Sequence, residues 1–189
     1  MSHHPAVFLD RDGTINREVD VLRDLKQLKI LPRAAEAIKK INRLGFLVIV
    51  ITNQPVIARG WLTEKEVDKI HAVLISRLAR KGAKIDAIYY CPHHPNANLK
   101  KYRVKCHCRK PNIGMILKAA KKYKINLKKS FMIGDHTRDI LTGKNAKLKT
   151  ILVKTGYAGK DNYYKIKPDF TTQNLQGAIK IIKRITSNQ

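Results

Sequence analysis

Short apolar runs alternate along this chain with segments of helical periodicity, and that alternation restricts the fold more than any other feature. The predicted strands cover residues 6–9, 47–51, 85–90, 131–133 and 150–153, with a last short strand at Phe170. The predicted helices cover about 32–44, 64–80, 111–123, 138–145 and 175–185. Such alternation predicts a central parallel sheet with helices on both faces, so we expect an α/β fold in a single domain spanning residues 1–189.

Parallel sheets of this kind bind ligands at the carboxyl ends of their strands. The residues that directly follow the predicted strands are therefore the first candidates for a functional site. They are Asp10 and Asp12, Thr52-Asn53-Gln54, the segment from Cys91 onward, and Asp135.

The chain is strongly basic, with 39 Lys and Arg against 14 Asp and Glu and a net charge of +25. Nucleic-acid binding would explain this charge. However, the lysines are scattered, so we favour a solvated surface that also attracts an anionic substrate.

No apolar run approaches the roughly 18–20 residues of a membrane helix, and residues 1–5 do not resemble a secretory signal. We expect a cytoplasmic monomer that binds neither membranes nor nucleic acid.

Two carboxylates follow the first strand in the sequence Asp10-Arg11-Asp12-Gly13-Thr14. An ordinary turn is the competing interpretation, because Asp and Gly are common in turns. Yet a carboxylate pair at a strand end can also hold Mg²⁺, which prefers oxygen ligands. One aspartate can attack phosphorus and form an acyl phosphate, while the other transfers protons.

Two further segments offer groups that could contact a phosphate. Thr52, Asn53 and Gln54 can donate hydrogen bonds to its oxygens, although a polar loop has the same composition. Arg109 and Lys110 stand at the start of the helix predicted from residue 111, where the helix N-terminus also favours an anion. A surface lysine is the alternative for Lys110.

A fourth segment, residues 134–139, again places a carboxylate directly after an apolar strand. Asp135 would complete a magnesium site with the carboxylates near residue 10, although a helix cap is its commoner role. Asp139 lies one helical turn further and could orient Lys110 or a metal-bound water.

All three cysteines lie within residues 91–108, beside several histidines. An odd number of cysteines without a signal peptide argues against a disulfide framework. Three cysteines and one histidine are a common ligand set for structural Zn²⁺, whereas coincidental buried cysteines are the alternative. The residues alone leave three candidate histidine ligands, His93, His94 and His107.

The four polar segments occur in the order and spacing of the haloacid dehalogenase (HAD) phosphatases, which the chain resembles over nearly its whole length. The resemblance implies a three-layer Rossmann-like fold, with Asp10 as nucleophile and Asp12 as general acid/base. It also implies that Thr52 binds the transferring phosphate and that Lys110 stabilises its charge. Mg²⁺ would be held by Asp10, Asp135 and the backbone carbonyl of Asp12.

The cysteine–histidine loop resembles the HAD branch that contains heptose 1,7-bisphosphate phosphatases and histidinol-phosphate phosphatase domains. In that branch the loop replaces a large cap domain and helps to cover the active site. Its structural zinc ligands match Cys91, His93, Cys106 and Cys108. Folding around zinc would fix the loop and orient Arg109 and Lys110.

The stand-alone length and the sequence Ile57-Ala58-Arg59-Gly60 resemble the heptose type. Pro55-Val56 stands where that type usually has Ser-Gly, and proline removes a backbone donor, which would alter specificity if that donor contacts the substrate. Arg59 is a candidate for binding the distal phosphate, although a surface arginine is its ordinary role. The further substrate-binding candidates are Asn53, Gln54, Arg109 and Lys110.

The resemblance therefore implies an Mg²⁺-dependent phosphatase that acts through an aspartyl-phosphate intermediate. It would remove the C7 phosphate of D-glycero-D-manno-heptose 1,7-bisphosphate, in the synthesis of nucleotide-activated heptose for lipopolysaccharide or surface polysaccharide. The alternatives are a histidinol-phosphate phosphatase, a nucleic-acid 3′-phosphatase and a basic binding protein without activity.

Overall fold

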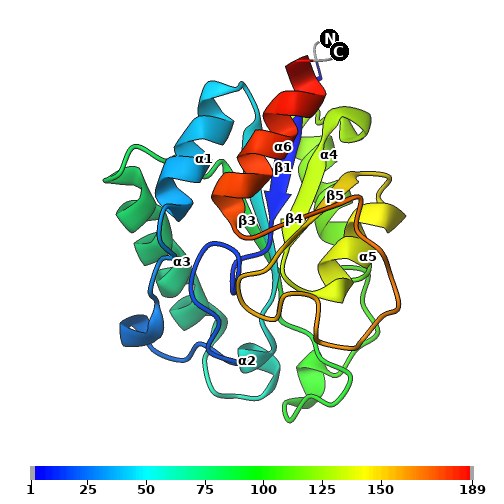
Figure 1. The fold of residues 1–189 in the computed structure, drawn as a ribbon. Coiled ribbons are helices and arrows are strands. Elements are labelled where there is room, and N and C mark those ends of the chain that lie inside the picture. The colour runs from blue at the N-terminus through cyan, green and yellow to red at the C-terminus, as the bar shows by residue number, and fades with distance from the viewer. Residues whose placement is uncertain (1–2, 188–189) are drawn as a thin grey trace.

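A computed structural model describes residues 3–187 of the chain (Figure 1). Residues 1–2, which belong to the N-terminal segment without a signal-like run, lie outside the described residues, as do 188–189. The strands are β1 (Ala6–Leu9), β2 (Leu47–Asn53), β3 (Ala87–Cys91), β4 (Phe131–Gly134), β5 (Lys149–Val153) and β6 (Phe170–Thr172). The helices are α1 (Ala34–Arg43), α2 (Pro55–Ala58), α3 (Glu64–Ala79), α4 (Gly114–Tyr123), α5 (Thr137–Asn145) and α6 (Leu175–Ser187).

The six strands form one parallel sheet in the order β3-β2-β1-β4-β5-β6. This arrangement confirms the predicted parallel sheet. β1 lies at its centre, where Val7 pairs with Val48 of β2 and with Phe131 of β4. The chain order reverses on either side of β1, which makes the carboxyl end of this strand the expected binding position.

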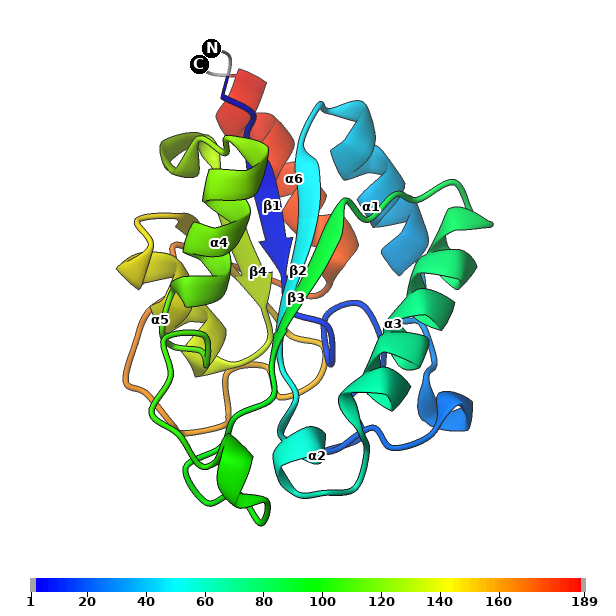
Figure 2. The same ribbon diagram turned by 180° about the vertical axis from the view of Figure 1, so that it is seen from behind.

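Alternate residues of each strand face opposite layers of helices. In β1, Val7 and Leu9 belong to the core cluster that packs against α1, α3 and α6, whereas Ala6 and Phe8 belong to the cluster that includes α4. Figure 1 shows α1 and α6 on the near face of the sheet, and Figure 2, seen from behind, shows α4 on the other. α5 packs on β4 and β5.

Local sequence explains several element ends. At the start of α3, the Thr63 hydroxyl accepts from the Glu66 amide while the Glu66 carboxylate accepts from the Thr63 amide, so the predicted capping box is confirmed. Gly45 follows α1 with a φ of 80°, which suits the turn into β2.

Near the carboxyl edge of the sheet, the structure differs from the prediction at α4, β2 and α2. α4 begins at Gly114 rather than at residue 111, because the amides of Lys110 and Gly114 donate to Asn53 Oδ1 and the His107 carbonyl oxygen instead of starting a helix. β2 continues to Asn53, which pairs with Cys91, so Thr52 lies inside the strand. The one-turn helix α2 was not predicted, because four residues are too short to show helical periodicity.

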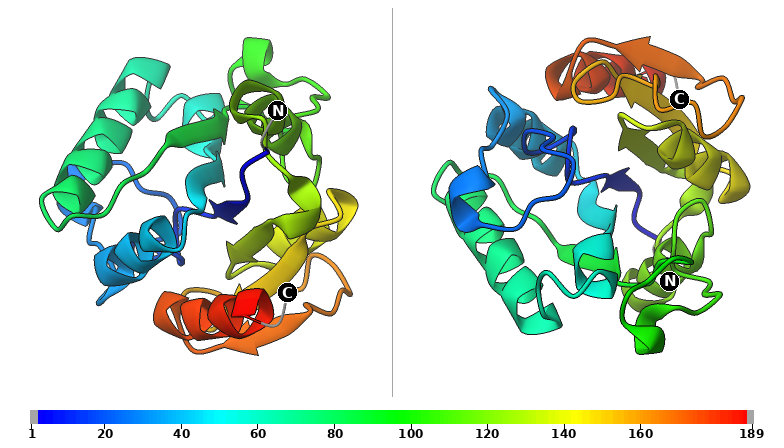
Figure 3. Two further views of the ribbon diagram at one scale, coloured as in Figure 1. Left: turned by 90° about the horizontal axis from the view of Figure 1, so that it is seen from above. Right: turned by 90° about the horizontal axis from the view of Figure 1, so that it is seen from below.

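The carboxyl ends of the strands meet under the longest connecting segments (Figure 3, right). These segments are residues 10–33, 92–113 and 154–169, which carry little regular structure apart from two short 3₁₀ turns, Leu25–Gln27 and Lys100–Tyr102. No helix in the described part of the chain is long and apolar enough to cross a membrane.

Candidate active site

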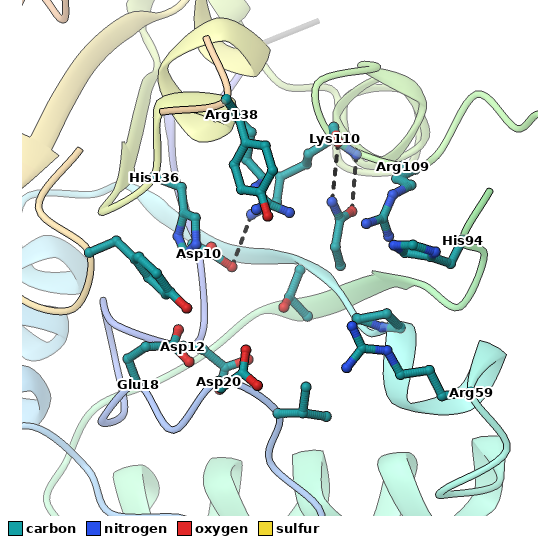
Figure 4. Close-up of a pocket in the computed structure, with 16 residues that line it drawn as sticks. Asp10, Asp12, Glu18, Asp20, Arg59, His94, Arg109, Lys110, His136 and Arg138 are labelled. Carbon is teal, nitrogen blue, oxygen red and sulfur yellow. Dashed lines mark hydrogen bonds and ion pairs between the residues drawn. The ribbon is translucent and has the colours of Figure 1, made fainter. Parts of the chain in front are cut away.

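A cavity opens at this carboxyl edge of the sheet (Figure 4). Acidic side chains line one side of it and cationic side chains much of the rest. Its charged and titratable lining residues are Asp10, Asp12, Glu18, Asp20, Arg59, His94, Arg109, Lys110, His136, Arg138, Tyr157 and Tyr163. The predicted Asp10, Asp12, Thr52, Asn53, Arg59, Arg109 and Lys110 are all among its lining residues.

Asp10 follows β1 directly and is almost completely buried, with 6% of its surface exposed. Its Oδ1 accepts from the Arg11 amide at 2.7 Å and lies 2.9 Å from the Lys110 ammonium. Burial, followed by the charge of Asp139, raises the pKa of Asp10 to about 6, while Lys110 opposes this rise. A cation bound at Asp10 would favour the ionised carboxylate that a nucleophile needs.

Lys110 is held in place through both its side chain and its backbone. Its Nζ lies 2.6 Å from Asp139 and 2.9 Å from Asp10, between the two buried carboxylates. Burial alone would lower the pKa of Lys110, but the two carboxylates raise it, so the ammonium stays charged. The amide of Asn53 bridges the Lys110 backbone, accepting from its N–H at 3.0 Å and donating to its carbonyl at 3.2 Å.

Asp12 is fixed by a network of donors from its own loop and from the end of β2. The Arg11 guanidinium contacts both of its oxygens, and Asn16 Nδ2 and Gln54 Nε2 also donate to it. Burial would raise the pKa of Asp12, but the charge and hydrogen bonds of Arg11 lower it. In turn, Arg11 Nη1 donates to Nε2 of the buried His71 at 3.0 Å.

The three polar residues predicted after β2 take different positions. The side chain of Thr52 lines the cavity, and Asn53 does so while its amide is engaged with Lys110. Gln54 is buried behind them, where its Nε2 donates to Thr52 Oγ1 at 2.9 Å and to Asp12. Gln54 is absent from the described lining residues, so its amide supports two other side chains instead.

The residues present fit a magnesium ion. Carboxylate oxygens of Asp10 and Asp135 belong to one buried group of ligand atoms within 4.8 Å of one another, and oxygen is the ligand that Mg²⁺ prefers. Two glycines let the backbone approach Asp135, since a Cβ at Gly13 or Gly156 would overlap its carboxylate. The Tyr157 amide and His136 Nδ1 also contact this carboxylate, at 2.8 and 3.2 Å.

The cysteine–histidine cluster fits zinc. Cys91 Sγ lies 3.6 Å from Cys106 Sγ and from His93 Nδ1, while Cys108 Sγ lies 3.0 Å from Cys91 Sγ and 3.3 Å from both Cys106 Sγ and His93 Nδ1. Ligand atoms about 2.0–2.3 Å from a tetrahedral ion would be roughly 3.3–3.8 Å apart, so these four atoms lie close enough together to share one ion. Of the three histidine candidates, His93 joins the cluster, His94 lines the cavity and His107 is exposed.

The zinc loop, about residues 91–108, and the cavity are joined through Arg109. This residue directly follows Cys108, its Nη1 donates to the His93 carbonyl at 2.9 Å, and its side chain lines the cavity. Arg59 also lines the cavity, and its guanidinium lies 4.8 Å from the ring centroid of Trp61. The guanidinium of Arg23 also stacks on this ring, at 3.4 Å.

Sequence reasoning missed several lining residues from the start of α5, the residue before it and the segment after β5. The rings of His136 and Tyr157 lie 4.4 Å apart, and the Arg138 guanidinium lies 4.4 Å from the ring of Tyr163. Arg138 could have been noted, because it lies between Asp135 and Asp139. The two tyrosines carry no motif, so only the fold identifies them.

Comparison with protein families gives a match to the HAD-hydrolase-like family over residues 107–178. The chain is 37% identical over 183 residues to D-glycero-beta-D-manno-heptose-1,7-bisphosphate 7-phosphatase of Pasteurella multocida, covering 96% of this chain and 98% of that protein. It is 41% identical over 153 residues to the alpha-anomer enzyme of Photorhabdus laumondii, covering 80% and 84%.

A crystal structure also resembles the fold closely. The D,D-heptose 1,7-bisphosphate phosphatase from B. bronchiseptica, complexed with magnesium and phosphate, superposes with a TM-score of 0.83. The two sequences are 28% identical, and the match covers 98% of this chain and 99% of that one.

Proposed function

This chain belongs to the D-glycero-D-manno-heptose-1,7-bisphosphate 7-phosphatase family of HAD-like hydrolases, and from that premise we propose that it removes the C7 phosphate of such a heptose bisphosphate. The observation that carries the chemistry is Asp10, a buried carboxylate at the end of the central strand beside the charged Lys110. The relatives favour a heptose substrate over histidinol phosphate or a nucleic-acid end. A monomer and a cytoplasmic location remain predictions.

In the first step, a carboxylate oxygen of Asp10 attacks the phosphorus atom, and the bond from phosphorus to the sugar oxygen breaks. Asp12 donates a proton to that leaving oxygen. Arg11 lowers the pKa of Asp12 in the free enzyme, but a bound phosphate dianion adds negative charge and favours the protonated form. The hydroxyl of Thr52 and the ammonium of Lys110 stabilise the charge on the transferring group.

In the second step, water attacks the phosphorus of the aspartyl phosphate and regenerates Asp10. Asp12, now ionised, accepts the proton of that water. Asp139 keeps Lys110 charged and directed at the phosphate, because its carboxylate holds the ammonium at 2.6 Å. Asn53 also helps to hold Lys110 in position, because its side-chain amide hydrogen-bonds to the Lys110 backbone.

Two metal ions complete the proposal. Asp10, Asp135 and the backbone carbonyl of Asp12 would hold Mg²⁺, which neutralises negative charge on the phosphoryl group when bound. Cys91, His93, Cys106 and Cys108 would hold structural Zn²⁺, which fixes the loop that carries Arg109 and Lys110.

Steady-state kinetics test the function directly. We expect the highest kcat/KM for one of the two anomers of heptose 1,7-bisphosphate, with inorganic phosphate as product, and a much lower value for histidinol phosphate. A preference for histidinol phosphate would reject the heptose assignment.

The nucleophile is tested with Asp10→Asn, which keeps the size of the side chain and removes its charge. We expect turnover to fall at least about 10³-fold while the circular dichroism spectrum stays that of the wild type. Substantial turnover by this variant would contradict the mechanism.

A further inference from the structure

The cavity has two electrically different sides. The carboxylates of Asp10, Asp12, Glu18 and Asp20 lie together in Figure 4, whereas Arg59 and Arg109 lie across from them. This acidic side contains the proposed nucleophile and acid/base. Arg59 and Arg109, on the cationic side, take no direct part in either phosphoryl-transfer step.

The cations of the cavity differ in whether their charge is compensated. Lys110 lies between the carboxylates of Asp10 and Asp139. By contrast, Arg59, Arg109 and Arg138 form no ion pair with any acidic side chain among residues 3–187. Three uncompensated guanidinium groups around one cavity repel one another, and an anion between them would remove that cost.

Arg138 is the member of this group that the reaction leaves wholly unexplained. Its Nε is buried and has no hydrogen-bond partner in the described part of the chain. Burial, followed by the charge of Arg138, lowers the pKa of Arg109, which shows that the two guanidinium groups repel each other electrostatically. A buried donor without a partner is uncommon in native proteins and calls for a partner such as a bound anion or an ordered water.

The position of Arg138 is set by the segment after β5. Asp161 accepts from both the amide and the hydroxyl of Thr137, at 2.9 and 2.8 Å, and the Tyr164 amide donates to the same hydroxyl. These bonds attach the segment to the first turn of α5. Tyr163, between the two attachment points, then stacks on the Arg138 guanidinium at 4.4 Å.

We propose that Arg138, positioned by Tyr163, is a specificity residue that binds the anionic group of the substrate remote from the phosphate being removed, together with Arg59 and Arg109. This inference rests on the proposed function, because it places the second phosphate of a sugar bisphosphate. A guanidinium suits this role, since it binds phosphate through two parallel hydrogen bonds and stays charged when partly buried. A surface arginine that only packs on Tyr163 is the alternative.

The test compares a bisphosphate with its monophosphate in Arg138→Gln. We expect the ratio of kcat/KM for heptose 1,7-bisphosphate to that for heptose 7-phosphate to fall at least about tenfold, through KM, because one charge-assisted contact is lost. An unchanged ratio would overturn the proposal, even if both activities decline together.

Tyr163 supplies a second, independent pair of variants. Tyr163→Leu removes the stacking ring and should lower the same ratio by a smaller factor, whereas Tyr163→Phe keeps the ring and should leave the ratio unchanged. Equal ratios in the Leu and Phe variants would reject the positioning role of the ring. Lys180→Gln on the exposed part of α6 removes the same charge outside the cavity and should not alter the ratio.

Failure of the proposed function gives a different result. In that case the wild type shows no preference for heptose 1,7-bisphosphate, and p-nitrophenyl phosphate serves as the reporter substrate. Fructose 1,6-bisphosphate should then inhibit more strongly than fructose 6-phosphate, and Arg138→Gln should abolish that difference. An equal difference in wild type and variant would overturn the role of Arg138 whatever the true substrate.

Discussion

Arg11 shows how a single buried side chain supports the proposed acid/base. Only 1% of its surface is exposed, and its guanidinium connects Asp12 on one side to His71 on the other. Because an arginine can only donate hydrogen bonds, His71 Nε2 must accept and the imidazole must be neutral. Burial, followed by the charge of Arg11, accordingly lowers the pKa of His71 to about 3.

The His71 contact makes the stability of the protein sensitive to mild acid. In the unfolded chain, His71 takes up a proton below its ordinary pKa of about 6.5, whereas in the folded protein it stays neutral to about pH 3. The unfolded state therefore binds more protons in this range, and stability falls as the pH is lowered. We expect His71 to account for a loss of about 2 kcal/mol in the free energy of unfolding between pH 7 and pH 5.

Urea unfolding of the wild type and of His71→Gln at these two pH values measures this loss. Gln retains an acceptor for Arg11 and does not titrate, so the variant should lose about 2 kcal/mol less than the wild type over the same interval. Equal losses in the two proteins would show that His71 is not kept neutral by the fold.

The zinc loop is the element that links a structural metal to the reaction. Cys108 is a member of the cluster, and the next two residues, Arg109 and Lys110, line the cavity. Loss of the metal would free the loop on both sides of Cys108, and the side chains of Arg109 and Lys110 would then move. Metal binding would stabilise this element, because so short a segment buries little apolar surface of its own.

Two histidines of the same loop provide a matched test of this link. His93→Asn removes a member of the cluster and should lower both the zinc content, measured by mass spectrometry of the metal, and kcat/KM by at least about tenfold. His107→Asn alters an exposed side chain in the same loop and should change neither. Full activity of a zinc-free His93 variant would contradict the link, as would failure of His107→Asn to retain zinc.

The predictable part of the molecule is the part set by local pattern. Alternating apolar runs were enough to place the strands, a capping box placed the start of α3, and Asp10 and Asp135 lie at strand ends as predicted. The contact of Arg138 with Tyr163 could not be predicted, because it depends on hydrogen bonds between Thr137 and Asp161, 24 residues apart. The start of α4 was misplaced for a similar reason, since Asn53 from β2 binds the Lys110 amide.

Over the whole molecule, a net charge of +25 surrounds a cavity that has its own acidic side. A charge of this size raises the local concentration of anions and speeds their arrival, whereas the carboxylates inside the cavity act only over short distances. The overall charge therefore favours anionic substrates as a class, and the cavity selects among them.

Salt should weaken this attraction, because the Debye length falls from about 10 Å at 0.1 M to about 3 Å at 1 M ionic strength. We expect kcat/KM for the bisphosphate to fall at least about threefold between 0.05 M and 0.5 M salt, with kcat little changed. The decrease in kcat/KM with salt should be smaller for p-nitrophenyl phosphate, because this substrate carries less negative charge than the bisphosphate. A kcat/KM that is independent of salt for both substrates would show that the overall charge has no role in capture.

The stacking of Arg23 and Arg59 on Trp61 gives the protein an optical property. Trp61 is the single tryptophan of the chain, and Arg59, one of its two stacked partners, also lines the cavity. All indole fluorescence therefore originates from a ring that contacts Arg59, a side chain that lines the cavity and that an anionic ligand would attract. The unlabelled protein thus contains its own reporter for events at Arg59, without interference from any other tryptophan.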